Sequence, residues 1–194
     1  MRTLAVTQNV SLDGSPEFLG EWFDPTAHAP DLNEEVLRQS AAEDVLLLGR
    51  QTFEDFRSFW PHQVDDQSGI AAHLDRVHKV VVSATLGEPG WVNTTVLDAD
   101  WRERVRALKE EDGGDIVVTG SLTLVPAVIK AGLVDEYRLF TFPAVQGRGR
   151  RLFPDGWEAG LELVRHQAFS NGVVLTVYAS DRRSQRTGRS GSGS

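Results

Sequence analysis

The sequence predicts an α/β domain whose central sheet is mixed, mostly parallel, and carries an antiparallel hairpin at its C-terminal end. Largely apolar runs at 45–48, 80–83 and 115–119 alternate with helical patterns, which is typical of parallel strands that helices cover on both faces. After Asp135 the pattern changes to strand-like alternation alone. The Ser170-Asn171-Gly172 sequence between the last two segments favours a β-hairpin turn.

The first strand is predicted from residue 4 to near Asp13, where apolar and polar residues alternate. Residues 15–30 have no regular period and carry the exposed-looking pair Trp22-Phe23. Unpatterned segments of this length are often lids or binding loops, so we expect one here.

The first helix is expected to begin at Asp31 as its N-cap, with Glu34 three residues later as the partner of a capping box. Leu32, Val36 and Leu37 are predicted on its buried side. The following elements are a strand at 45–48, helices at 51–60 and 70–77, a strand at 80–83, a helix at 101–108, a strand from 115, a helix that Gly132 closes, and strands at 137–143, 161–169 and 173–179. Residues 1–181 are predicted to form one domain, followed by a disordered tail at 182–194 that is rich in Gly, Ser and Arg.

Composition narrows the classes of partner. The 194 residues carry a net charge of −8, which disfavours nucleic acid and anionic membranes as partners. The sequence contains no cysteine, and no apolar stretch approaches the ~20 residues of a membrane span. We therefore expect a cytoplasmic protein without disulfides or thiolate chemistry.

Three predicted strands end in turns that are suited to an anionic ligand. Gly120-Ser121 follows one strand, Gly49-Arg50-Gln51-Thr52 follows another, and Ser83-Ala84-Thr85 follows a third. Unpaired N–H groups at such strand-to-helix turns bind phosphate without any lysine, and parallel strands place their ligands at this edge. Taken alone, the Gly49 turn is equally compatible with a surface arginine beside an ordinary helix cap, and the Ser83 turn is better explained as a polar turn that ends a strand. The Gly120 turn is also compatible with a plain strand-to-helix turn, because the G-x-G-x-x-G fingerprint is absent.

Other polar residues carry weaker signals. Asp13 ends the first strand and is a candidate proton donor, whereas Glu34 and Glu35 are expected to be caps or solvated charges. The basic loop at 147–151 is expected to touch an anionic ligand or a partner subunit. The five histidines lack metal-ligand spacing, so we predict no metal site.

Six ordered motifs together resemble one known family. They are Asn9-Val10-Ser11-Leu12-Asp13-Gly14, Leu48-Gly49-Arg50-Gln51-Thr52-Phe53, Val82-Ser83-Ala84-Thr85-Leu86, Val118-Thr119-Gly120-Ser121-Leu122, Ala131-Gly132-Leu133-Val134-Asp135-Glu136 and Gly147-Arg148-Gly149-Arg150-Arg151-Leu152-Phe153. Over residues 2–180 the sequence resembles the RibD C-terminal reductase-like family. The resemblance implies a dihydrofolate reductase-like, three-layer α/β/α fold.

The resemblance also implies that NADPH lies across the carboxyl edge of the sheet. The implied coenzyme contacts are Gly49, Arg50 and Thr52 in one turn, Ser83 and Thr85 in the next, Gly120, Ser121 and Leu122 around the diphosphate, and Thr7 near the nicotinamide. Asp13 would flank the substrate. Two positions depart from the pattern: Ala84 stands where many relatives have an arginine near the ribose 2′-phosphate, a role that Arg50 is able to fill, and Asn33 stands where folate reductases have their catalytic acid.

The predicted function is therefore that of an NADPH-dependent reductase of a C=N or C=O group. The specific expectation is 5-amino-6-(5-phosphoribosylamino)uracil reduction in riboflavin biosynthesis, with the proton supplied by Asp13 or by a water that it orients. The alternatives are reduction of a dihydropterin or another small carbonyl compound, and a non-catalytic NADP(H)-binding protein. The apolar edge after Asp135 predicts a homodimer.

Overall fold

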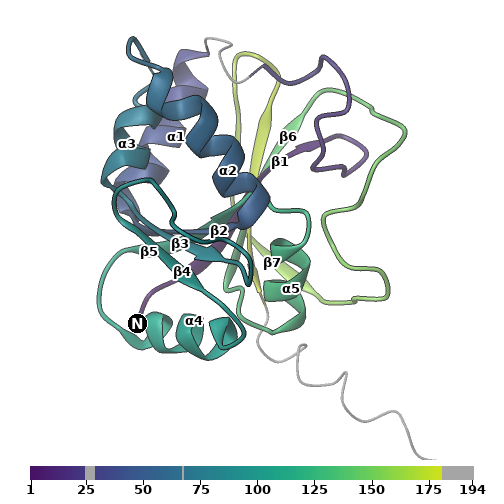
Figure 1. The fold of residues 1–194 in the computed structure, drawn as a ribbon. Coiled ribbons are helices and arrows are strands. Elements are labelled where there is room, and N and C mark those ends of the chain that lie inside the picture. The colour runs from purple at the N-terminus through teal and green to yellow at the C-terminus, as the bar shows by residue number, and fades with distance from the viewer. Residues whose placement is uncertain (25–28, 67, 181–194) are drawn as a thin grey trace, which may run out of the picture.

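One eight-stranded sheet organises the chain in a computed structural model that describes residues 1–24, 29–66 and 68–180 (Figure 1). Its spatial order is β4-β3-β2-β5-β1-β6-β8-β7. The strands are β1 (Leu4–Ser11), β2 (Glu43–Gly49), β3 (His78–Val82), β4 (Thr94–Leu97), β5 (Asp115–Thr119), β6 (Glu136–Phe142), β7 (Leu161–Ala168) and β8 (Val174–Ser180). The first six strands in this spatial order, β4-β3-β2-β5-β1-β6, pair in parallel. Strand β8 pairs antiparallel with both β6 and β7. The predicted mixed sheet is confirmed.

Helices cover both faces of this sheet. They are α1 (Pro30–Ala42), α2 (Arg50–Phe59), α3 (Ile70–Arg76), α4 (Trp101–Glu110) and α5 (Leu124–Lys130), with a 3₁₀ turn, η1 (Trp60–His62), after α2. Figure 1 shows α1, α2 and α3 on one side of the sheet and α4 and α5 on the other. The three-layer α/β/α architecture inferred from the resemblance is therefore present.

The apolar runs are explained by this double cover. In β2, Leu46 and Leu48 pack with Phe53 of α2, while Leu47 packs with residues of α4 and α5. Successive side chains of a strand point to opposite faces, so a strand that is buried on both faces must be apolar at every position. The same division of neighbours occurs in β5, where Val117 and Val118 belong to different clusters.

The start of α1 differs from the expectation. Its N-cap is Ala29, and Pro30 opens the helix, as suits a residue that has no N–H to satisfy. Asp31 lies in the first turn, where its carboxylate accepts bonds from the Ser170 amide at 2.7 Å and the Ser170 hydroxyl at 2.8 Å. It thus fastens the helix to the β7–β8 turn instead of capping it.

Leu32 and Val36 lie on the buried side of α1 as predicted, but the third residue of that prediction was wrong and one strand was missed. Leu37 is 43% exposed, whereas Glu35 is 4% exposed, because Glu35 meets an arginine of β7. The short strand β4 was not predicted, since it has no residue in the fully buried core.

Within the described parts of the chain, every helix is too short or too polar to span a membrane. The predicted tail, residues 182–194, lies outside the described residues, and the homodimer stays a prediction.

Candidate functional site

The carboxyl ends of four parallel strands form one edge of the sheet. Strands β3, β2, β5 and β1 are neighbours in that order, so the turns after them start side by side along this edge. Three of these turns are those that the sequence singled out, after Val82, Gly49 and Thr119. We call this edge, from residues 83–85 to residues 119–122, the carboxyl rim.

Two turns of the carboxyl rim touch each other directly. The Ser121 amide donates a hydrogen bond of 2.8 Å to Thr52 Oγ1. A Cβ atom on Gly49 would lie 2.2 Å from Ser121 Oγ, and one on Gly120 would lie 2.7 Å from Thr52 Cγ2. Gly120 also has φ of +62°, a conformation that favours glycine. Both glycines are therefore required for the two turns to approach this closely.

The hydroxyl groups of the carboxyl rim are oriented by backbone amides. Thr52 Oγ1 accepts from Ser121, Ser121 Oγ accepts from the Leu124 amide at 3.0 Å, and Ser83 Oγ accepts from the amides two and three residues ahead, at 3.1 and 2.9 Å. A hydroxyl that accepts in this way keeps its own proton for donation. The rim therefore presents hydroxyl donors from two neighbouring turns and a third strand end to any anionic group placed there.

Most of the chain matches one protein family. The family model of the RibD C-terminal domain matches residues 2–175. The chain belongs to this family. The RibD C-terminal domain accordingly accounts for all the strands except the last residues of β8.

One relative and two solved structures are similar to this chain over most of its length. The chain is 31% identical over 185 residues to the uncharacterized protein YyaP of Bacillus subtilis, covering 91% of this chain and 94% of YyaP. The structure of a putative riboflavin biosynthesis protein from Shewanella superposes with a TM-score of 0.74 at 19% identity, covering 93% of this chain and 99% of the other. Dihydrofolate reductase from Enterococcus faecalis, complexed with NADP(H), gives a TM-score of 0.62 at 17% identity, covering 92% and 96%. These structures show that this RibD C-terminal domain has the dihydrofolate reductase-like fold.

Asp13 of this RibD C-terminal domain is exposed and tied into loop contacts. Its carboxylate accepts bonds from Ser11 Oγ at 2.6 Å and from the amides of Gln146 and Gly147 at 3.1 and 2.7 Å. These bonds, that of Ser11 above all, lower the pKa of Asp13 to about 2. A carboxylate with this pKa is ionised near neutral pH, which favours a water oriented by Asp13 over Asp13 itself as the proton donor. The role of Asp13 in a reaction stays a prediction, and in this structure its carboxylate joins two loops.

Gln146 completes this joint between the loop after β1 and the loop after β6. Its Oε1 accepts from Trp22 Nε1 at 2.8 Å and from the Leu19 amide at 3.1 Å, and its Nε2 donates to Ser15 Oγ at 2.9 Å. The described part of the predicted binding loop is therefore held by side chains from far along the sequence.

Aromatic rings cover the end of β6 beside this joint. Phe18 and Phe23 stack with ring centroids 4.1 Å apart, and Trp22 and Phe23 both contact Phe142, at 5.4 and 5.5 Å. Phe18 is 47% exposed. The Trp22-Phe23 pair is thus part of an aromatic wall of four rings, which we define as Phe18, Trp22, Phe23 and Phe142.

Polar residues on the central strands extend the site below the rim. Thr7 Oγ1 is buried and has no hydrogen-bond partner within the described residues. Thr7 pairs with Thr119 of β5, and Asn9 lies two residues further on the same face. A buried hydroxyl without a partner is unusual, and it favours contact with a bound molecule. Thr119 and Asn9 belong to motifs that the sequence singled out but were not predicted as contact residues, although a polar residue inside an apolar strand was the available signal.

The remaining predicted residues lie at the surface of the rim. Arg50 Nη1 pairs with Glu54, at 3.2 and 3.1 Å from its two oxygens, so it is not held toward Ser83 or Thr85. Leu122 lines a small hollow with Gly120 and Ser121, and Arg151 lines the same hollow. The basic loop at 147–151 was expected to touch an anionic ligand or a partner subunit, and Arg151 is the residue of that loop that lies beside the carboxyl rim.

Proposed function

We propose that this protein is an NADPH-dependent reductase that binds its coenzyme across the carboxyl rim. The observation that carries the proposal is the direct contact between the turns after β2 and β5, in which two glycines leave no room for a Cβ. Membership of the RibD C-terminal domain family supports a reductase, and the NADP(H) complex of the similar Enterococcus structure supports the choice of coenzyme.

The residues fit such a coenzyme. Thr52 and Ser121 would donate hydrogen bonds to the diphosphate, and Arg151 would be the nearby cation. Hydroxyl, amide and guanidinium donors together can bind phosphate oxygens without a lysine. Ser83 and Thr85 would lie toward the ribose phosphate, and Leu122 would lie beside the diphosphate. Arg50 would reach the ribose phosphate only after its side chain leaves Glu54. Thr7, whose buried hydroxyl lacks a partner, would contact the nicotinamide end. The coenzyme, when bound, supplies hydride, and the protein supplies orientation and electrostatics.

The proposed substrate is a planar heterocycle, with 5-amino-6-(5-phosphoribosylamino)uracil as the specific candidate. The aromatic wall offers ring faces on which a heterocycle can stack, and Asn9 and Thr119 offer polar contacts below it. The family relationship supports this compound. A dihydropterin is less well supported, because Asn33 stands where folate reductases have their catalytic acid and has no carboxyl group. Two other substrates, a dihydropterin and another small carbonyl compound, are alternatives to the uracil derivative. A third alternative is a protein that binds the coenzyme without turnover.

The proposal is tested by titrating the protein with NADPH, followed by an assay of NADPH oxidation with each candidate compound. Saturable binding and turnover of the uracil derivative are expected. Saturable binding without turnover of any compound would identify a coenzyme-binding protein, and no saturable binding would overturn the proposal.

Thr52→Val is expected to raise the Kd for NADPH about tenfold, because it removes a donor to the diphosphate and leaves the Ser121 amide without its acceptor. Thr52→Ser retains the hydroxyl and serves as the matched control, with a Kd within about twofold of the parent. Fluorescence titration measures both. Equal Kd values for the valine and serine variants would place the coenzyme elsewhere.

Asp13→Asn is expected to lower turnover by no more than about tenfold, since a general acid contributes about 10²–10⁴-fold and the ionised Asp13 is not that acid. Steady-state kinetics with whichever compound is reduced provides the measurement. A loss of about a hundredfold or more at unchanged NADPH affinity would restore Asp13 as the proton donor.

A further inference from the structure

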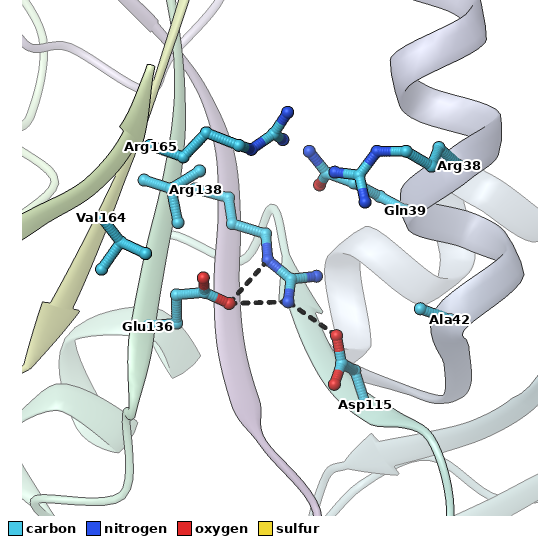
Figure 2. Close-up of a pocket in the computed structure, with 9 residues that line it drawn as sticks. Arg38, Gln39, Ala42, Asp115, Glu136, Arg138, Val164 and Arg165 are labelled. Carbon is cyan, nitrogen blue, oxygen red and sulfur yellow. Dashed lines mark hydrogen bonds and ion pairs between the residues drawn. The ribbon is translucent and has the colours of Figure 1, made fainter. Parts of the chain in front are cut away.

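A charged cavity lies at the opposite edge of the sheet from the carboxyl rim. It has a volume of about 270 Å³ and opens between the C-terminal half of α1 and the strands β5, β6, β7 and β8. Figure 2 shows Arg38 reaching into it from α1, Arg138 from β6 and Arg165 from β7. Asp115 and Glu136, which also line it, are the first residues of β5 and β6, so the cavity lies at the amino ends of these strands.

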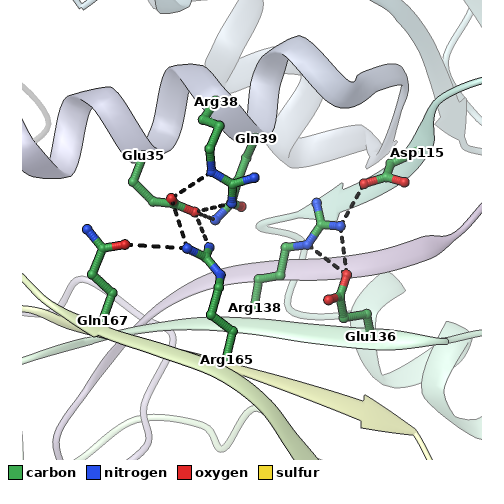
Figure 3. A network of polar contacts seen from close by, with 8 residues as sticks. All are labelled: Glu35, Arg38, Gln39, Asp115, Glu136, Arg138, Arg165 and Gln167. Atoms are coloured by element: carbon green, nitrogen blue, oxygen red, sulfur yellow. Dashed lines mark hydrogen bonds and ion pairs between the residues drawn. The ribbon is translucent and has the colours of Figure 1, made fainter.

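Arg138 is held at the cavity floor by two carboxylates. Its Nε and Nη2 donate to Glu136 Oε2 at 3.0 and 2.7 Å, and Nη2 also donates to Asp115 Oδ2 at 2.6 Å. Its side chain is 11% exposed. The Nη1 group makes no hydrogen bond to any described residue, and Figure 3 shows it on the side of the guanidinium away from Glu136.

The other two arginines share one carboxylate. Glu35 is 4% exposed and accepts from Arg38 Nε and Nη2 at 2.9 and 2.8 Å, from Gln39 Nε2 at 2.7 Å, and from Arg165 Nη1 at 3.2 Å, with a further bond from Arg165 Nη2 (Figure 3). The Nη1 of Arg38 and the Nε of Arg165 have no acceptor among the described residues.

Each of the three guanidiniums around the cavity therefore keeps N–H groups that no described residue accepts. Their charges are balanced by Glu35, Asp115 and Glu136, so the case for a ligand rests on these unused N–H groups. A guanidinium carries five N–H groups and no acceptor. The carboxylate of Glu35 already receives five bonds, so it has little capacity left for the unused N–H groups. Three guanidiniums around one cavity are also the arrangement that binds carboxylate or phosphate oxygens well.

We propose that this cavity is a second ligand site, which binds a small oxyanion bearing a phosphate or carboxylate group between Arg38, Arg138 and Arg165. The volume suits inorganic phosphate, a small phosphate ester or a small organic acid. The site is separate from the carboxyl rim and is independent of the proposed reductase activity. Occupation would bridge α1 to β6 and β7 and stabilise the packing of α1 on the sheet.

The first test measures Tm as inorganic phosphate or malonate is added in the absence of NADPH, with sodium chloride at equal ionic strength as the reference. A saturable rise of about 3–6 °C is expected at about ten times the Kd. The stronger of the two anions identifies the oxyanion class. No saturable rise with either anion, or an equal rise with chloride, overturns the proposal.

The second test uses a pair of variants on β7 that add the same charge. Val164 lines the cavity and is 60% exposed, whereas Leu163 is 50% exposed and does not line it. Val164→Glu is expected to weaken oxyanion binding about tenfold by charge repulsion, and Leu163→Glu is the matched control with little change. Equal effects in the two variants, which a nonspecific ionic response would give, contradict the site.

A third variant tests the arginines themselves. Arg38→Gln removes an exposed guanidinium and leaves Arg165 on Glu35, so the protein is expected to fold and to bind the oxyanion about tenfold more weakly. Arg138 is less suitable, because its removal would leave Asp115 and Glu136 without their common partner. Competition between NADPH and the bound oxyanion would show that the oxyanion occupies the coenzyme site and would overturn the proposal.

Discussion

Gly49→Ala is expected to lower the free energy of unfolding by about 2–3 kcal/mol and to weaken NADPH binding with it. The new Cβ would lie 2.2 Å from Ser121 Oγ and 3.0 Å from Ser121 Cβ, so one of the two turns must move. Movement separates the hydroxyl groups that the coenzyme is proposed to bind. Urea unfolding gives the stability, and fluorescence titration gives the Kd.

A second substitution separates the clash from other effects of alanine. With Ser121→Gly in the same chain, the nearest remaining atom to the new Cβ is Leu124 Cβ at 3.7 Å, which is an ordinary contact. Ser121 has φ of +50°, where glycine is unstrained. The double variant is therefore expected to regain most of the lost stability, and Gly87→Ala, which meets no atom within 4 Å, should be nearly neutral. A double variant as unstable as the single one would show that the turns do not touch in solution.

Glu35→Gln is expected to lower the free energy of unfolding by about 3–5 kcal/mol, because it removes the buried charge that Arg38 and Arg165 share. Glu34→Gln is the matched control, since the neighbouring Glu34 is exposed and its removal should change stability by less than about 0.5 kcal/mol. Urea unfolding at neutral pH compares the two. A loss in Glu35→Gln as small as that of the control would mean that the network adds little to stability.

The same variant should change the response to acid. Burial raises the pKa of Glu35, but the bonds from Arg38, Arg165 and Gln39 outweigh it and hold the pKa at about 2, below the usual value of 4.5. A folded-state pKa below the unfolded one stabilises the protein above the unfolded pKa, and this contribution is lost as pH falls toward the folded pKa. The parent protein is therefore expected to lose more stability than Glu35→Gln between about pH 5 and pH 2.

Much of the fold follows from patterns that are local in the sequence. The run Val45-Leu46-Leu47-Leu48 predicted a strand buried on both faces, and the structure divides its side chains between two clusters. The order of strands and helices then predicted that the turns containing Gly49 and Gly120 share one edge. A strand that is covered on both faces must be apolar throughout, so its sequence alone reveals its environment.

Partners distant in sequence decided what these patterns left open. Glu35 was expected to be a cap or a solvated charge because it lies beside Glu34 near the start of a helix, yet Arg165, 130 residues away, makes it part of a buried network. Lysine side chains are almost never fully buried, but Lys79 is, with Nζ donating to the Leu74 and Val77 carbonyls at 2.5 and 3.0 Å. The pKa of Asp13 is lowered most by the nearby Ser11 hydroxyl, and further by the distant amides of Gln146 and Gly147.

Local sequence patterns were sufficient to predict the α/β class, the alternation of strands and helices, and the residues at the strand ends of the carboxyl rim. The bond from Ser121 to Thr52, the attachment of the ionised Asp13 to a second loop, and the three arginines around one cavity became apparent only in the folded chain. Hydrophobic periodicity is a property of neighbouring residues, whereas the protonation and pairing of a polar group depend on whichever distant group the fold places within hydrogen-bond distance.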